Sequence, residues 1–171
     1  RIPFPDLLRR AESVVTTSVT EGFGLAFLEP WLLGTGLLGR NLPEITSEFG
    51  EAGVDLGVLY DELSVPVEWC GGENEVIWRM GAKFADAMSQ FGLTMEADEG
   101  VGCCRGLVSG GRVDFGRLDE AMQRTVIQKV VEDPGARKEL NPESLDPRGV
   151  AKISRPRLTP GGRDRLPAYI N

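Results

Sequence analysis

The sequence contains no histidine among its 171 residues. This absence excludes Ser-His-Asp and Cys-His catalysis by this chain alone, and it excludes metal sites built on imidazole nitrogens. Any acid–base chemistry carried out by these residues must therefore use carboxylate, lysine, tyrosine or cysteine side chains.

Cysteines and long apolar runs are also scarce. The three cysteines are an odd number and form no C-x-x-C pair, which argues against a disulfide framework. We therefore expect reduced thiols and a cytoplasmic protein. No apolar run approaches the roughly 20 residues that a membrane-spanning helix needs. Because the first residue is Arg1 rather than methionine, we expect the chain to be part of a longer protein.

Positive charge is in deficit and unevenly distributed. The net charge of −7 makes free nucleic acid a poor partner. Residues 146–171 carry six basic and two acidic side chains, a net +4, which leaves −11 for residues 1–145. This stretch also contains proline and glycine, and we expect a solvated basic tail. The alternatives are a tail that binds its own domain, a partner or an anionic membrane surface.

The N-terminal third alternates between helical and strand patterns. Helical spacing predicts a short helix over 5–11, and a β-branched, uncharged run predicts a buried parallel strand over 13–18. A glycine loop, an apolar helix over 24–33 and a second strand over 37–39 follow. Strand, helix and strand in this order form a right-handed βαβ unit. Residues 42–45 are typical of a turn that leads into another helix.

The rest of the chain is less regular. We expect a strand over 64–69, confined to a sheet edge by Pro66, and an amphipathic helix over 73–91. Another helix is predicted over 118–131, a break over 133–135 and a last short helix over 136–140. The glycine-rich stretch 92–112 supports no assignment. The predicted fold class is α/β, with a parallel Rossmann-like sheet and flanking helices in one domain over 1–145, followed by the tail over 146–171.

The candidate catalytic and binding residues lie between the first two predicted strands. Glu21 and Glu29 are eight positions apart, and glycines 22 and 24 bracket Phe23. Ligands of open α/β sheets bind at the carboxyl ends of strands, where this loop lies, and the following helix presents its N–H groups and positive dipole end to an anion. Glu29 lies roughly 8 Å along that helix from its first residue. This spacing suits a diphosphate at the helix start, a sugar at the loop and a ribose on Glu29; glutamates that only cap and solvate the helix are the alternative.

The whole string resembles the E-x7-E signature of the retaining GT-B glycosyltransferases, specifically the family 4-like members. This group includes sucrose synthases, bacterial glycogen synthases and many lipopolysaccharide and mannosyl transferases. The resemblance covers residues 7–49 and is weaker at 117–122 and 132–137. Pro30 departs from the pattern and removes one helix hydrogen bond. The matching positions are Ser18, Glu21, Gly22, Phe23, Gly24, Leu25, Leu28 and Glu29.

The resemblance implies a role for each of these residues. Glu21, the candidate catalytic residue, would contact hydroxyls of the transferred sugar, and Glu29 would bind the nucleotide ribose. The backbone of Gly22, Phe23, Gly24 and Leu25 would surround the sugar and the phosphates. The family needs no metal or other cofactor, because basic side chains and helix dipoles offset the charge of the leaving diphosphate. Its diphosphate-binding Arg and Lys, its acceptor domain and the first strands of its C-terminal domain precede the residues of this chain.

The resemblance therefore predicts the donor-binding part of an enzyme that moves a hexose from a nucleotide diphosphate sugar to an acceptor with retention. We expect the chain alone to be inactive. The expected partners are the nucleotide-sugar donor and an N-terminal acceptor domain or a separate subunit. A parallel sheet without its first strands has an open edge, so self-association is also expected. The alternative is a truncated, non-catalytic binding or interaction module.

Overall fold

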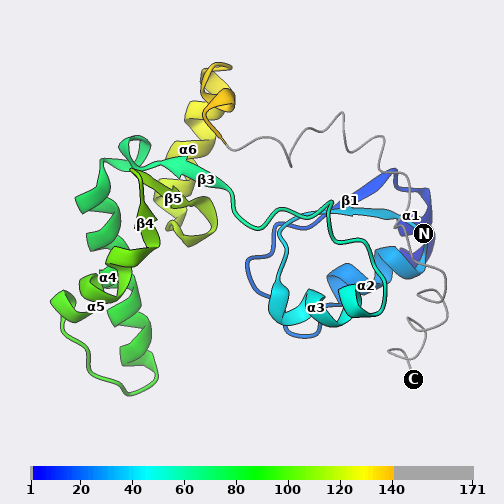
Figure 1. Cartoon of the computed structure of the whole chain (residues 1–171), viewed down its shortest axis with the longest axis horizontal. Helices are drawn as coiled ribbons and strands as arrows, with labels where there is room; N and C mark the ends of the chain where they lie inside the picture. The colour runs from blue at the N-terminus through cyan, green and yellow to red at the C-terminus, as the bar shows by residue number, and fades with distance from the viewer. Residues whose placement is uncertain (1, 141–171) are drawn as a thin grey trace. The chain divides into compact units, whose positions relative to one another are not determined.

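The computed structural model describes residues 2–140, which form two compact units, residues 2–61 and 62–140. Both units mix helices with short strands, and the first has a parallel sheet whereas the second has an antiparallel one (Figure 1). The sequence predicts one domain over 1–145, whereas residues 2–140 divide between residues 61 and 62. The predicted basic tail, 146–171, lies outside the described residues.

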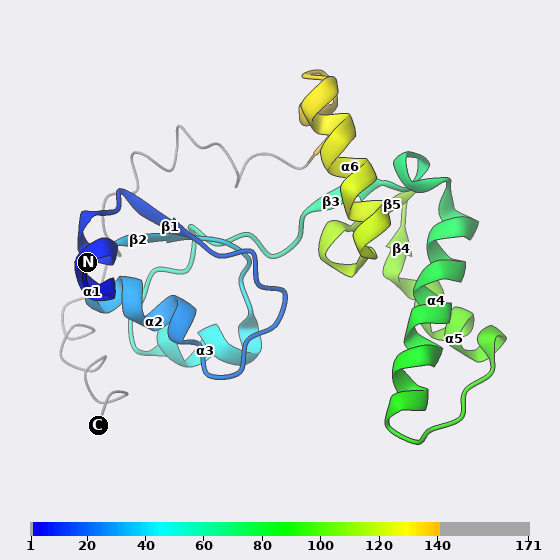
Figure 2. The ribbon, with the colours of Figure 1, turned by 180° about the vertical axis from the view of Figure 1, so that it is seen from behind.

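The first unit contains the predicted βαβ arrangement. Strands β1 and β2 are parallel, with Ser13 opposite Gly36 and Val15 opposite Leu38. Helices α2 and α3 lie on the same side of these strands (Figures 1 and 2). The first strand is shorter than the predicted 13–18, because the chain leaves the ladder after the Thr16 amide donates to the Leu38 carbonyl at 2.8 Å. The elements are α1 (Phe4–Arg10), β1 (Ser13–Val15), α2 (Leu25–Leu32), β2 (Gly36–Leu38) and α3 (Pro43–Glu51).

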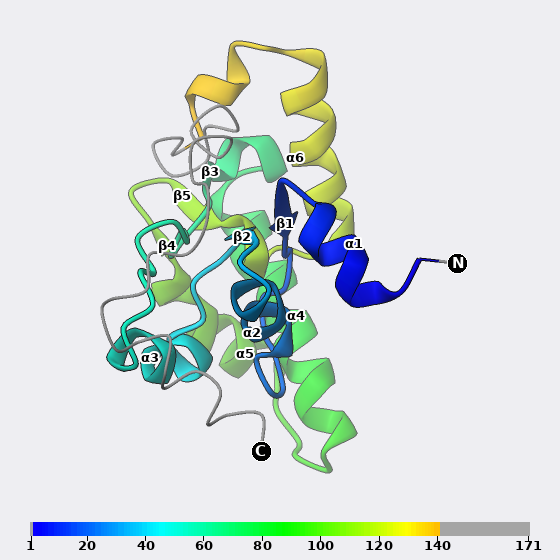
Figure 3. The same cartoon turned by 90° about the vertical axis from the view of Figure 1, so that its right-hand side faces the viewer.

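Helix α1 lies next to the strands (Figure 3). The hydroxyl of Thr35, just before β2, donates to the Leu8 carbonyl at 2.8 Å. In the described part of the chain β1 pairs with β2 alone, and the Val15 side chain is 66% exposed. Self-association through this strand stays a prediction.

The core of the first unit lies around α2. The Trp31 ring packs edge-on against Phe49 of α3, with centroids 5.6 Å apart. Removal of this apolar surface from water, rather than the short two-stranded sheet, supplies most of the stabilisation. The buried cluster consists of Phe27, Leu28, Trp31, Leu37, Leu42, Phe49, Val54 and Leu59.

The second unit is built on a three-stranded antiparallel sheet with the order β3-β5-β4. Strand β3 lies at the edge of this sheet, as predicted, but it ends at Pro66 rather than at residue 69, because Val67–Cys70 form the short helix η1. The helices predicted over 73–91 and 118–131 are confirmed as α4 and α6, and the break after α6 lies at Asp133. The elements are β3 (Ser64–Pro66), η1 (Val67–Cys70), α4 (Glu73–Gln90), α5 (Ala97–Cys104), η2 (Arg105–Leu107), β4 (Val108–Ser109), β5 (Arg112–Asp114), η3 (Phe115–Arg117), α6 (Glu120–Glu132) and η4 (Ala136–Lys138).

The unassigned stretch 92–112 forms a helix and a hairpin. Helix α5 begins with a capping box between Glu96 and Glu99. Gly110 and Gly111 both have positive φ, 57° and 69°, as a two-residue hairpin turn requires. Helices α4 and α5 approach so closely that a Cβ on Gly100 would collide with the Gly81 carbonyl. This contact explains glycines inside two helices, where they are otherwise unfavourable.

Candidate functional site

The loop of the predicted donor site leaves the carboxyl end of β1 and is held by its own side chains. The Ser18 hydroxyl donates to Oε1 of Glu21 at 2.7 Å, and the Ser18 amide donates to Oγ1 of Thr16 at 3.3 Å. These bonds place the Glu21 carboxylate on the loop, half-buried, between β1 and α2. The predicted loop position of Glu21 is confirmed.

Gly24 joins this loop to α2 and has a left-handed backbone, with φ 69°. A Cβ at this position would collide with Cγ2 of Ile45 on α3, so only glycine fits both the conformation and the space. No side chain within the described residues caps the first turn of α2, and this turn contains no acidic residue. Among residues 2–140, no side chain therefore neutralises the N–H groups and the positive dipole end of α2.

The other predicted site residues lie on the surface around this turn. The Phe23 side chain is 89% exposed, and Gly22 and Leu25 are exposed as well. Glu29 is exposed on α2 directly before the buried Pro30, the proline that departs from the family pattern. The structure thus places Glu21 on the loop and Glu29 on the helix, in the order that the sequence predicts.

A basic residue that the sequence analysis did not single out lies at the same sheet edge. Because β1 and β2 are parallel, Arg40 follows the carboxyl end of β2 as the glycine loop follows β1. Its guanidinium carbon lies 5.7 Å from the centroid of the Tyr60 ring, and its Nη1 donates to the Asp61 carbonyl at 3.3 Å. Nδ2 of Asn41 donates to Oδ1 of Asp61 at 2.9 Å. The signal that could have identified this position is a basic residue directly after the second predicted strand.

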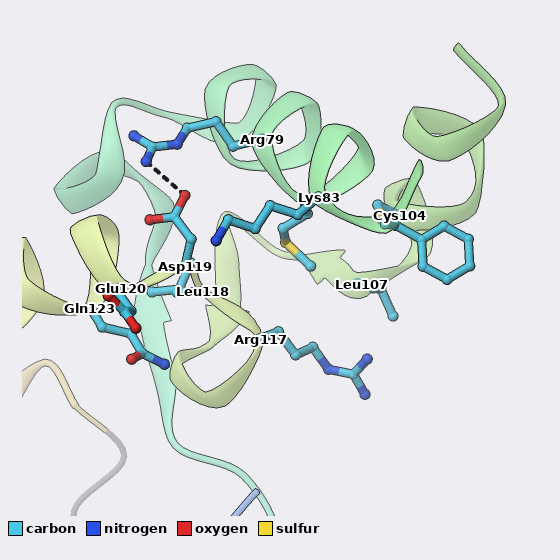
Figure 4. Close-up of a pocket in the computed structure, with 11 residues that line it drawn as sticks. Arg79, Lys83, Cys104, Leu107, Arg117, Leu118, Asp119, Glu120 and Gln123 are labelled. Carbon is cyan, nitrogen blue, oxygen red and sulfur yellow. Dashed lines mark ion pairs between the residues drawn. The ribbon is translucent and has the colours of Figure 1, made fainter. Parts of the chain in front are cut away.

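The second unit contains a cleft of about 400 Å³ between α4, α5 and the start of α6 (Figure 4). An ion pair between Nη2 of Arg79 and Oδ2 of Asp119, 2.7 Å apart, joins two of its walls. Asp119 also caps α6, since its Oδ1 accepts from the Met122 amide at 2.9 Å. Burial alone raises the pKa of Asp119, but the Met122 amide and the Arg79 guanidinium outweigh it, so the pKa is lowered. The carboxylate is therefore charged at neutral pH.

Comparisons with family models, curated proteins and solved structures find no match to this chain. Within residues 2–140, no helix is both long enough and apolar enough to cross a membrane.

Proposed function

We propose that the first unit binds the nucleoside diphosphate part of a nucleotide sugar, as the donor-binding part of a retaining hexosyltransferase with a Rossmann-like sheet. One observation carries the proposal: α2 begins at a left-handed glycine at the carboxyl edge of a parallel sheet, and no side chain in the described part of the chain caps its first turn. A helix start without a cap, behind a glycine loop, is a ready-made phosphate site.

The backbone of the loop and the first turn accounts for the diphosphate. Gly22 is exposed and has no side chain, and a Cβ at this position would meet no atom within 4 Å, so phosphate oxygens can approach the backbone before the first helical turn closely. Arg40 adds a positive charge at the same sheet edge, and a guanidinium suits phosphate oxygens geometrically. Together they offset the negative charge that accumulates on the diphosphate as it leaves, without a metal ion.

The two glutamates account for the hydroxyl-bearing parts of the donor. A carboxylate accepts hydrogen bonds only, and it therefore matches the hydroxyl groups of a sugar or a ribose. Ser18 holds Glu21 in a fixed position at 2.7 Å, which suits it to orient the transferred hexose. Glu29 is exposed on α2 beyond the phosphate position and is assigned to the ribose. Both glutamates then bind substrate rather than stabilise the fold.

Transfer itself needs an acceptor oriented against the anomeric carbon of the donor, and such orientation is a large part of catalysis. In this proposal an N-terminal domain or a separate subunit supplies the acceptor site, and residues 2–61 alone do not transfer sugar. A cytoplasmic location and free thiols at Cys70, Cys103 and Cys104 are part of the same proposal.

A second candidate function is a non-catalytic interaction module. The observation that favours it is the exposure of three apolar residues, Val19 and Phe23 on the same loop and Leu25 at the start of α2. Adjacent exposed apolar side chains mark protein interaction surfaces in many folds.

Calorimetric titration of the full chain with UDP, GDP and ADP tests the donor-binding proposal. We expect one preferred nucleotide, and we expect Glu29→Ala to lower its affinity at least about tenfold, since hydrogen bonds to a charged group are lost. Glu48→Ala, an exposed glutamate on α3, is the matched control and should leave the affinity unchanged. Equal affinities of wild type and Glu29→Ala would overturn the ribose assignment, and absence of any nucleotide binding would favour the interaction module.

A further inference from the structure

The cleft of the second unit is lined by both basic and apolar side chains. We propose that it binds a small organic anion in which a carboxylate or phosphate group is joined to an apolar body. The site is formed by side chains of α4, α5, η2, η3 and the start of α6. It does not depend on donor binding by the first unit, because no residue of 2–61 lines it.

The charges around the cleft favour an anion. Arg79, Lys83 and Arg117 line it together with the carboxylates of Asp119 and Glu120, which leaves a net charge of +1. Arg79 and Asp119 satisfy each other at 2.7 Å, and the Asp119 side chain is only 7% exposed. This pair is a fixed, neutral wall, and the net positive charge comes from the remaining side chains.

Two of these side chains retain hydrogen-bond donors for a ligand. Within residues 2–140 no carboxylate lies at ion-pair distance from Lys83, and its ammonium has three donors. Nε of Arg117 forms an ion pair with Oδ2 of Asp114 at 3.8 Å, a distance longer than a hydrogen bond, so the N–H groups of Arg117 remain donors for a ligand. Figure 4 shows Lys83 extending toward Asp119, whereas the guanidinium of Arg117 points away from the Arg79–Asp119 pair. A single anionic group bound beside Lys83 would gain charge-assisted hydrogen bonds.

The remaining wall of the cleft is uncharged. Met80, Phe84, Leu107 and Leu118 contribute carbon surface, and Cys104 contributes a buried thiol. Burial, and to a smaller extent the neighbouring Cys103, raises the pKa of Cys104, so this thiol stays neutral at physiological pH. In Figure 4, Cys104 and Leu107 lie at the opposite side of the cleft from Glu120 and Gln123. The apolar body of the ligand would displace water from this end.

The size of the cleft limits the ligand to a small molecule. Its volume of about 400 Å³ is at the lower end of the range for ligand pockets, roughly 300–1,000 Å³. An aromatic ring with one anionic substituent fits both this volume and the division into a basic and an apolar side. Inorganic phosphate alone would not displace water from the apolar side chains of the cleft.

Calorimetric titrations of the full chain with phenyl phosphate, phenylacetate, inorganic phosphate and benzylamine test the proposal. We expect saturable one-to-one binding of a phenyl anion, at least about tenfold tighter than that of inorganic phosphate or benzylamine, because only it uses both sides. Comparison of the affinities of phenyl phosphate and phenylacetate shows whether the cleft prefers a phosphate or a carboxylate group. Lys83→Met should weaken binding about tenfold, and Lys83→Glu should weaken it further.

Lys138→Met is the matched control, since this exposed lysine lies on η4 and does not line the cleft. Circular dichroism establishes that each variant is folded, and Arg117→Gln provides a second test at another basic residue that lines the cleft. Three results would each overturn the proposal: no saturable binding of either phenyl anion, equally tight binding of benzylamine, or unchanged affinity in both Lys83→Met and Arg117→Gln. If Gly24→Ala abolished binding of the phenyl anion, the anion would be assigned to the first unit, and the cleft proposal would also be overturned.

Discussion

The two units form their candidate sites in different ways. In the first unit the site is mostly backbone: a glycine loop and the start of α2, with Gly24 required by both its φ of 69° and the contact with Ile45. In the second unit the site is made of side chains, and Arg79 and Asp119 meet across 40 positions of sequence. A backbone site leaves a continuous sequence pattern, whereas a side-chain site of this kind leaves none.

Trp31→Ala is expected to have the largest effect on stability. Trp31 is 3% exposed in the core of the first unit, and loss of a large buried aromatic costs about 3–5 kcal/mol. Hydrogen exchange read by mass spectrometry should show lost protection in residues 2–61 and retained protection in 62–140. Trp78→Ala is the control, because Trp78 is 58% exposed and an exposed substitution changes stability by about 0.5 kcal/mol or less. Equal loss of protection in both units would contradict their separation.

Gly24→Ala should have the next largest effect. The new methyl group would be strained by the positive φ and would collide with Ile45, at a cost of about 1–3 kcal/mol. Urea unfolding measures this cost, and nucleotide titration should show weaker binding as α2 shifts. Gly22→Ala is the stability control, because a Cβ at Gly22 has no atom within 4 Å. If Gly24→Ala were as stable as Gly22→Ala, the close approach of α2 and α3 would be wrong.

Asp119→Asn should have the smallest effect and one that depends on pH. Asparagine still caps a helix, so the loss comes from the charge paired with Arg79. The pKa of Asp119 is lower in the folded state than in the unfolded state. The contribution of its charge to the stability of the fold is therefore complete above the unfolded-state pKa of about 3.9. This contribution is lost as the pH falls through the folded-state pKa.

Urea unfolding at several pH values measures the free-energy difference between wild type and Asp119→Asn. The difference should be largest near neutral pH and should disappear in acid. Asp98→Asn, in the first turn of α5, removes no ion pair among residues 2–140 and serves as the control. A difference that did not change with pH would contradict the ionised pair.

Much of the fold followed from local patterns in the sequence. Apolar periodicity predicted α4 and α6, and a β-branched run, an apolar helix and a leucine pair in this order predicted β1, α2 and β2. Helix α5 was missed because Gly100 lowers helix propensity, and only its packing against Gly81 offsets that loss. The capping box at Glu96 and Glu99 and the paired glycines 110 and 111 were usable signals for α5 and for the hairpin.

The sequence by itself determined the loop that joins β1 to α2, because adjacent residues set the turn, the helix start and the spacing of Glu21 and Glu29. Only the tertiary structure decided that the chain divides after residue 61 and that Arg79 meets Asp119. The physical reason is the range of the interactions. Turn and helix preferences act over a few residues, whereas core packing and ion pairing join residues that are distant in the chain.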